Sequence, residues 1–133
     1  IQSIPNFSFH TLKGEVFTQE NLPNKATIFV YFNSDCDYCK SEATKIHKRL
    51  DDFKDTQLVF ISFETVTGIT QFAKDYKLDN KENVLFLEDR KGVFSQIFDA
   101  NSIPFILVYD ANKKLLQKFK GVTKIDNILE VLE

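Results

Sequence analysis

The chain of 133 residues lacks methionine and tryptophan, and it contains only two cysteines, four glycines and three prolines. Two cysteines cannot build a disulfide-rich scaffold, and they cannot complete a zinc site of four cysteines. No apolar run approaches the roughly 20 residues that a membrane-spanning helix needs. The 17 basic residues do not outnumber the 19 acidic ones, and the net charge is -2. We therefore expect no nucleic-acid partner.

The rest of the composition is that of an ordinary globular protein. Hydrophobic residues make up 43% of the chain and charged residues 27%, which argues against a disordered polypeptide. A chain of this length can bury one core, so residues 1–133 are predicted to form a single domain. Because the sequence opens at Ile1 and has no methionine, we expect the native start to be missing. Either a targeting segment was removed, or the domain was excised from a longer precursor.

Hydrophobic periodicity divides the chain into alternating strands and helices. Residues 1–25 predict an N-terminal hairpin with a turn at Lys13-Gly14. Continuous apolar or β-branched runs predict buried strands, and apolar residues at helical spacing predict helices. Strands are expected at 27–32, 58–63, 83–87, 105–109 and 115–119, and helices at 36–53, 69–76, 93–98 and 125–132. This order predicts an α/β fold with a central, mostly parallel sheet and an antiparallel edge.

Two finer expectations concern single residues. Thr123 is a candidate N-cap for the last helix. Five phenylalanines are expected in the core rather than in a ligand pocket: Phe29, Phe32, Phe60, Phe63 and Phe105.

The segment Cys36-Asp37-Tyr38-Cys39 lies where the buried strand at 27–32 gives way to a helix. Cysteines three residues apart on a helical turn are close enough to form a disulfide, and the free N–H groups of a helix start favour a thiolate at the first one. We expect Cys36 to be an exposed nucleophile and Cys39 a more buried resolving thiol. Such a pair attacks a partner disulfide, forms a mixed disulfide and resolves it internally.

Other uses of this cysteine pair are less well supported. A disulfide that closes so short a loop constrains little of the unfolded chain, which disfavours a purely stabilising bridge. A structural metal site needs about four cysteine or histidine ligands, and only His10 and His47 remain. A non-catalytic binding module, whose cysteine pair is vestigial or holds copper between two thiolates, is a further alternative. Copper suits soft sulfur ligands, but no methionine or paired histidine supports it. No metal site is predicted.

The strand, the dithiol at a helix start and the later Ile103-Pro104 before a buried strand resemble the thioredoxin fold. In that family the equivalent proline is cis and lies beside the dithiol, and the backbone before it pairs with the bound partner segment. The resemblance implies that Ile103 and Pro104 bind substrate. Tyr38, at the exposed turn of the site, is a candidate substrate contact, with simple packing as the alternative.

Within that fold, the whole chain is most similar to the TlpA/ResA-type thiol–disulfide oxidoreductases. The N-terminal hairpin, a central strand–helix insertion around 61–87 and the stretch Cys39-Lys40-Ser41-Glu42 carry the resemblance. It implies that Glu42 is a carboxylate near the dithiol, which relays protons or raises a thiol pKa by like-charge repulsion. The alternative is an ordinary first-turn glutamate that favours the helix dipole.

The sequence departs from these relatives around the first cysteine. Asp35 stands where the family usually has tryptophan, Asp37-Tyr38 separates the cysteines, and Val30 stands where thioredoxins place a buried acid. The proton relay therefore differs from that of thioredoxin. The charges of Asp35 and Asp37 oppose a thiolate, and a less stabilised thiolate makes the reduced form less favoured. We expect a reducing dithiol.

The predicted function is a protein-disulfide reductase that needs no cofactor beyond the redox-active Cys36–Cys39 disulfide. Because there is no dinucleotide-binding fingerprint, the electrons must come from another protein. The resemblance implies a disulfide-bearing protein substrate, a membrane thiol transporter as the upstream donor, and a role in cytochrome c maturation or extracytoplasmic thiol homeostasis. We expect a monomer in the periplasm, either soluble or membrane-tethered, with a cytoplasmic location as the alternative.

A peroxiredoxin-type peroxidase shares this fold and is the other enzymatic alternative. It requires a threonine three residues before the nucleophile and a proline nearby upstream. Asn33 and Phe32 stand there in this chain, so the sequence favours disulfide reduction over peroxide reduction.

Overall fold

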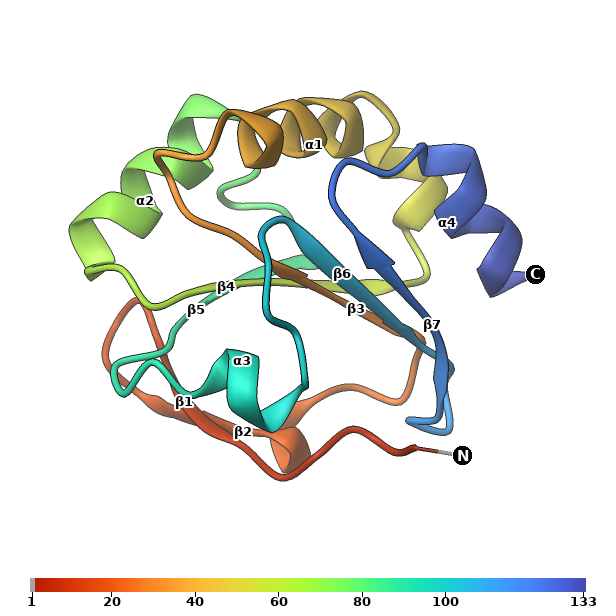
Figure 1. Ribbon diagram of the computed structural model, residues 1–133, viewed down its shortest axis with the longest axis horizontal. Coiled ribbons are helices and arrows are strands. Elements are labelled where there is room, and N and C mark those ends of the chain that lie inside the picture. The colour runs from red at the N-terminus through yellow and green to blue at the C-terminus, as the bar shows by residue number, and fades with distance from the viewer. Residues whose placement is uncertain (1) are drawn as a thin grey trace.

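The computed structural model describes residues 2–133 and contains one seven-stranded sheet with helices on both faces (Figure 1). The strands are β1 (Ser8–Thr11), β2 (Val16–Thr18), β3 (Thr27–Tyr31), β4 (Gln57–Ser62), β5 (Val84–Glu88), β6 (Phe105–Tyr109) and β7 (Leu115–Lys120). The α-helices are α1 (Asp37–Lys48), α2 (Val66–Asp75), α3 (Phe94–Ile97) and α4 (Ile125–Leu132), with short 3-10 helices η1 (Gln19–Asn21) and η2 (Leu50–Phe53).

The strands lie in the order β2-β1-β5-β4-β3-β6-β7. The centre is parallel, as predicted, because β3 pairs with β4 and β4 with β5 in parallel. Antiparallel pairing extends further than expected, since it joins β6 to β3, β7 to β6, and the first hairpin to β5. The reason is that the loop after α3 delivers the chain to the carboxyl end of β3, where Phe105 pairs with Tyr31. From that point β6 can only run back along β3.

The predicted N-terminal hairpin is present as β1 and β2. Its turn includes Gly14, whose φ of 87° lies in the left-handed region that glycine adopts without steric cost. β1 then pairs with β5, so the hairpin extends the sheet. The predicted insertion is also present, as α2 followed by β5 beside β4.

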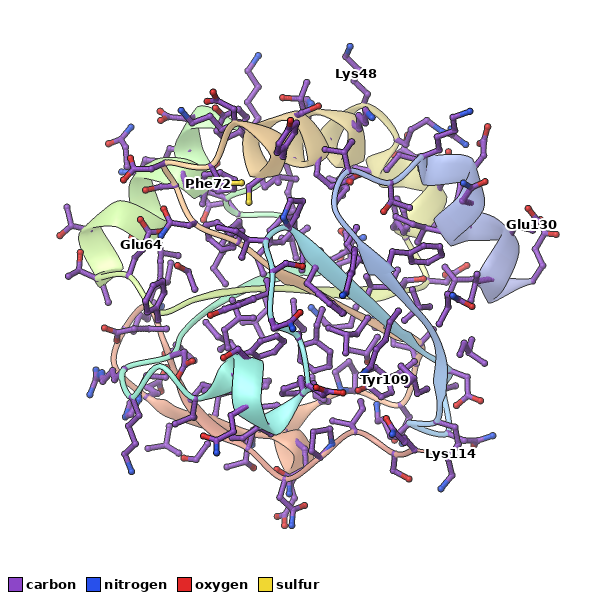
Figure 2. All side chains as sticks on the ribbon, viewed as in Figure 1. Lys48, Glu64, Phe72, Tyr109, Lys114 and Glu130 are labelled. Atoms are coloured by element: carbon purple, nitrogen blue, oxygen red, sulfur yellow. The ribbon has the colours of Figure 1, made fainter. Side chains whose placement is uncertain are left out.

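Alternate residues of each central strand face opposite sides of the sheet. Ile28 and Val30 of β3 face a core that α1, α2 and α4 cover. Phe29 and Tyr31 face a second core, which α3 and the N-terminal segment cover. Figure 1 shows this division, with α3 and the hairpin on the side opposite the three longer helices, and Figure 2 shows side chains filling both layers.

Two of the finer expectations were wrong. Phe63 is 57% exposed rather than buried, because β4 ends at Ser62 and the chain turns outward at the sheet edge. The N-cap of α4 is Lys124 and not Thr123. The Thr123 hydroxyl instead donates to the Gly121 carbonyl at 3.0 Å. Among the described residues, none of the helices has the length and apolarity of a membrane-spanning segment.

The second core depends on stacked aromatic rings, and this gives a stability prediction. Phe94 is fully buried and its ring centroid lies 4.2 Å from that of Phe98 and 4.8 Å from that of Tyr31. Phe94→Ala should lower the free energy of unfolding by about 3–5 kcal/mol, through lost burial and a cavity. Phe63→Ala makes the same chemical change at an exposed ring and should stay within about 0.5 kcal/mol of the parent. Urea unfolding of both variants checks this, and equal losses would contradict it.

Candidate active site

Cys36 ends the turn that leads from β3 into α1, and its sulfur caps the helix. The Cys39 backbone N–H donates to Cys36 Sγ at 3.1 Å, in the place where a serine or aspartate oxygen usually accepts. The turn is closed by Asn33, whose Oδ1 accepts from the Asp35 N–H at 2.9 Å and whose carbonyl accepts from the Cys36 N–H at 3.2 Å. The two sulfur atoms, yellow in Figure 2, therefore lie together at the start of α1.

The two thiols, which are not bonded to each other, differ in exposure. Cys36 is half-buried and reachable, whereas Cys39 is only 2% exposed. Burial raises the pKa of Cys39 to about 12, with further contributions from hydrogen bonding to Cys36 and from the charges of Cys36 and Glu64. Of these influences on the Cys39 pKa, only the hydrogen bond with the Asn33 backbone lowers it. The pair thus combines an accessible outer thiol with a buried inner thiol that holds its proton.

The Ile103–Pro104 peptide bond is cis, as the resemblance implied. Phe105 pairs with Tyr31, so Pro104 lies beside the end of β3, close to where the turn toward Cys36 begins. Pro104 is buried and its carbonyl accepts from the Gly121 N–H at 2.9 Å, while Ile103 is exposed. Tyr38, in the first turn of α1, is 69% exposed. The sequence-predicted site residues Cys36, Cys39 and Pro104 therefore border the same edge of the sheet.

Glu42 is fully buried one helical turn after Cys39. Its Oε1 accepts from the Thr123 N–H at 2.6 Å, and its Oε2 has no hydrogen-bond partner. Burial raises the pKa of this carboxyl, and the Thr123 hydrogen bond offsets only part of that effect. Because the neighbouring Gly121 contacts Pro104, Glu42 connects the dithiol helix to the loop that borders the proline.

Sequence reasoning missed Glu64, which is the carboxylate whose charge raises the pKa of Cys39. It follows β4, and it accepts hydrogen bonds from the Ser34 N–H at 2.8 Å, the Ser62 hydroxyl at 3.0 Å and the Ser34 hydroxyl. Figure 2 labels it beside α2. The sequence held a usable signal, because the carboxyl ends of neighbouring parallel strands meet at one sheet edge. Residues following 58–62 were therefore candidates for contact with the turn before Cys36.

The residues that differ from the thioredoxin-like relatives have defined positions in the structure. Val30 is buried in the apolar core, so the preceding strand supplies no acid. Asp35 and Asp37 are exposed on either side of Cys36, and Asp37 pairs with Lys40 at 3.5 Å. Between residues 2 and 133, no three His, Cys, Asp or Glu side chains come together in a way that could hold a metal ion.

The sheet order, the dithiol at the start of α1 and the cis-proline define a thioredoxin-like fold. The chain belongs to the AhpC/TSA family, whose model matches residues 2–128. No protein of curated function matches the sequence.

Solved structures with the same fold include both disulfide oxidoreductases and a peroxidoxin. A secreted Mycobacterium tuberculosis disulfide oxidoreductase homologous to E. coli DsbE is 19% identical, with a TM-score of 0.79 over 94% of this chain and 92% of that one. StoA from Bacillus subtilis is 19% identical, with a TM-score of 0.75 over 99% and 100% of the two chains. Peroxidoxin BcpB from Mycobacterium tuberculosis is 16% identical, with a TM-score of 0.80 over 98% and 93%. The fold is thus shared across two thiol chemistries, and the residues at the site must distinguish them.

The high pKa of Cys39 predicts selective alkylation. A brief pulse of iodoacetamide between pH 7 and 9 should modify Cys36 and leave Cys39 unmodified, because the thiolate is the reactive form. Glu64→Gln removes a charge that raises the pKa of Cys39, so alkylation of Cys39 should begin at a lower pH. The exposed Glu130→Gln leaves that charge in place and is the control. Mass spectrometry of each cysteine measures the result, and equal rates at both cysteines would contradict it.

The buried carboxyl of Glu42 predicts a pH-dependent stability. Its folded-state pKa is raised above the ordinary value of 4.5, so the folded protein binds more protons than the unfolded chain just above that pH. The contribution of Glu42 to stability therefore falls as pH rises from 4.5 through the folded pKa. Glu42→Gln keeps an acceptor for Thr123 and does not titrate.

The stability of Glu42→Gln relative to the parent should therefore increase from pH 4 to pH 7. Urea unfolding at both pH values measures it, with the exposed Glu130→Gln as the matched control. A parent protein that gains stability over Glu42→Gln as pH rises would show that the carboxylate, not the acid, is the favoured form.

Proposed function

We propose that the protein is a thiol–disulfide oxidoreductase of the TlpA/ResA type that reduces disulfides in other proteins. The observation that carries this proposal is the asymmetry of the dithiol. The outer sulfur of Cys36 is reachable and accepts an N–H from the helix start, while the inner Cys39 is buried and protonated. A nucleophile and a resolving thiol require these two different environments.

The reaction begins when the Cys36 thiolate attacks one sulfur of the partner disulfide. The new Cys36–partner bond forms as the partner disulfide breaks, and the partner's other sulfur leaves as a thiolate that takes up a proton. Cys39 then loses its proton and attacks Cys36 Sγ. The Cys36–Cys39 disulfide forms as the mixed disulfide breaks, and the released partner thiolate is protonated. Two electrons and two protons have passed to the partner.

Ile103 and Tyr38 are proposed to hold the substrate segment against Cys36. Ile103 is exposed just before β6, and we propose that its backbone pairs with an extended substrate segment as an added strand. Pro104 is fixed behind it by the Gly121 hydrogen bond. Tyr38 presents an exposed aromatic ring in the first turn of α1, two residues after Cys36.

Glu42 and Glu64 are proposed to influence the protonation of Cys39 in different ways. Burial keeps Cys39 protonated before the mixed disulfide forms, and the charge of Glu64 adds to this effect because it opposes a second negative charge nearby. Burial raises the pKa of Glu42, one turn along α1, which favours its protonated form, and its Oε2 has no hydrogen-bond partner. We assign it the proton relay that supports the Cys39 step.

The same proposal includes the electron donor, the compartment and the cellular role. The Cys36–Cys39 pair is the only redox group required, and a second protein, of the membrane thiol transporter class, restores the dithiol. The exposed charges of Asp35 and Asp37 beside Cys36 favour a reducing dithiol. A monomer outside the cytoplasm, in the periplasm, is the proposed setting. Cytochrome c maturation or extracytoplasmic thiol homeostasis is the proposed role.

Two cysteine variants test the proposal. Cys36→Ser should abolish the reduction of insulin disulfides, with a loss of at least about a thousandfold, because no nucleophile remains. Cys39→Ala should react once and stay covalently bound to its partner, since nothing resolves the mixed disulfide. Mass spectrometry of the trapped species identifies the partner. Reduction that survives Cys36→Ser, or a Cys39→Ala protein that traps no disulfide, would rule out this mechanism.

A peroxidase is the second candidate, because the family and the fold are shared with a peroxidoxin. The residue three positions before Cys36 is Asn33, and its side chain accepts from Asp35 in closing the turn. It therefore offers no hydroxyl where a peroxidase uses threonine. Consumption of hydrogen peroxide by the reduced protein at a rate above that of insulin reduction would favour the peroxidase.

A further inference from the structure

The segment between α3 and β6 does little to hold itself in place. Residues 101–103 are exposed, and across residues 2–133 their N–H and carbonyl groups make no hydrogen bond to other backbone groups. Asp99, just before them, borders a cleft of about 310 Å³ between the end of α3 and the N-terminal segment. Figure 1 shows the segment rising from α3 to the start of β6. Its position therefore depends on the contacts at its two ends.

The amino end of this segment has an unusual backbone conformation. The Ala100 N–H donates to the Ser95 carbonyl at 2.9 Å, which closes the end of α3 as a Schellman motif. Asp99 lies within that motif with a φ of 52°, in the left-handed region that residues other than glycine rarely adopt. Glycine would adopt this conformation without steric cost. The presence of a side chain at position 99 therefore points to a contact that the side chain or its backbone makes.

Lys118 of β7 makes that contact. Its Nζ donates to the Asp99 carbonyl at 3.3 Å and lies 3.7 Å from Asp99 Oδ2. Lys118 pairs with Leu107, whose side chain lies in the second core, so both residues are on the face of the sheet that α3 covers. The carboxylate of Asp99 is 96% exposed, and water and salt screen the ion pair. The bond to the carbonyl restrains the backbone itself.

Residues of β7 and the turn after it thus restrain both ends of the exposed segment. Lys118 binds Asp99 at the amino end, and the Gly121 N–H donates to the Pro104 carbonyl at 2.9 Å at the carboxyl end. A polypeptide that pairs with an unrestrained loop must order the loop, and the lost conformational entropy weakens binding. A segment that is already held at both ends avoids most of that cost before the substrate arrives.

We infer that Lys118 is a positioning residue for the proposed disulfide exchange, which holds residues 101–103 ready to pair with a polypeptide substrate by binding Asp99. The inference rests on the proposed function. Lys118 lies on the α3 face of the sheet, whereas Cys36 and Cys39 pack with the core on the opposite face. Loss of Lys118 should therefore raise KM for protein disulfides and leave kcat unchanged, because it weakens binding without altering the reacting sulfur atoms.

The test measures the kinetics of insulin reduction by the full chain and its variants. Lys118→Met keeps the aliphatic stem and removes the donor, and it should raise KM for insulin about fivefold, as expected for the loss of one partly exposed charge-assisted contact. Lys118→Arg should keep the parental KM, because a guanidinium can donate to the same carbonyl. Asp99→Asn tolerates the left-handed conformation and keeps the carbonyl but not the charge, so its KM should rise less than that of Lys118→Met.

Two controls separate this inference from general damage. The small disulfide 5,5′-dithiobis(2-nitrobenzoate) offers no polypeptide strand to pair with the segment, so Lys118→Met should reduce it at the parental rate. Lys13→Met removes the same charge from the exposed turn of the N-terminal hairpin, at the opposite edge of the sheet from β7, and should keep the parental KM for insulin.

The outcomes are distinguishable. An unchanged KM for insulin in Lys118→Met would overturn the inference and leave the reductase in place. An equal loss of activity toward insulin and the small disulfide would also overturn it, because Lys118 would then support the fold as a whole. The same holds if Lys118→Arg is as impaired as Lys118→Met. A parent that reduces neither disulfide would overturn the proposed function and the inference together.

Discussion

The hydrogen bond from the Cys39 N–H to Cys36 Sγ is the contact on which the rest of the site depends. It makes the Cys36 sulfur the cap of its own helix, so the start of α1 and the orientation of Cys36 are one structural feature. The same geometry turns Cys39 inward, where burial keeps it protonated. A single helix start thus gives two chemically identical side chains different environments.

Carboxylates act on this helix start from two directions. Glu64, from the turn after β4, binds Ser34 in the turn before Cys36, and its charge acts on Cys39. Glu42, from within α1, binds Thr123 in the loop whose Gly121 contacts Pro104. The dithiol is therefore connected to both neighbouring segments of the site. The preceding strand itself contributes no carboxylate, because Val30 packs in the apolar core.

The protein distributes its aromatic rings between core and surface by position rather than by type. The rings of Phe29, Phe94 and Phe98 pack against one another in the second core, where their burial stabilises the attachment of α3 to the sheet. Phe63 has the same side chain, but it lies one residue past the end of β4 and faces water. Its environment follows from where the strand ends, which hydrophobicity alone does not encode.

The sequence by itself determined the α/β architecture, the parallel centre of the sheet, the N-terminal hairpin and the position of the two cysteines at a helix start. These features follow from local periodicity and turn residues, which act over a few positions. Only the tertiary structure decided that Glu64 acts on Cys39, that Thr123 binds Glu42 instead of capping α4, and that Phe63 is exposed. Each of these depends on contacts between distant segments brought together by strand pairing, and no local pattern specifies which side chains then meet.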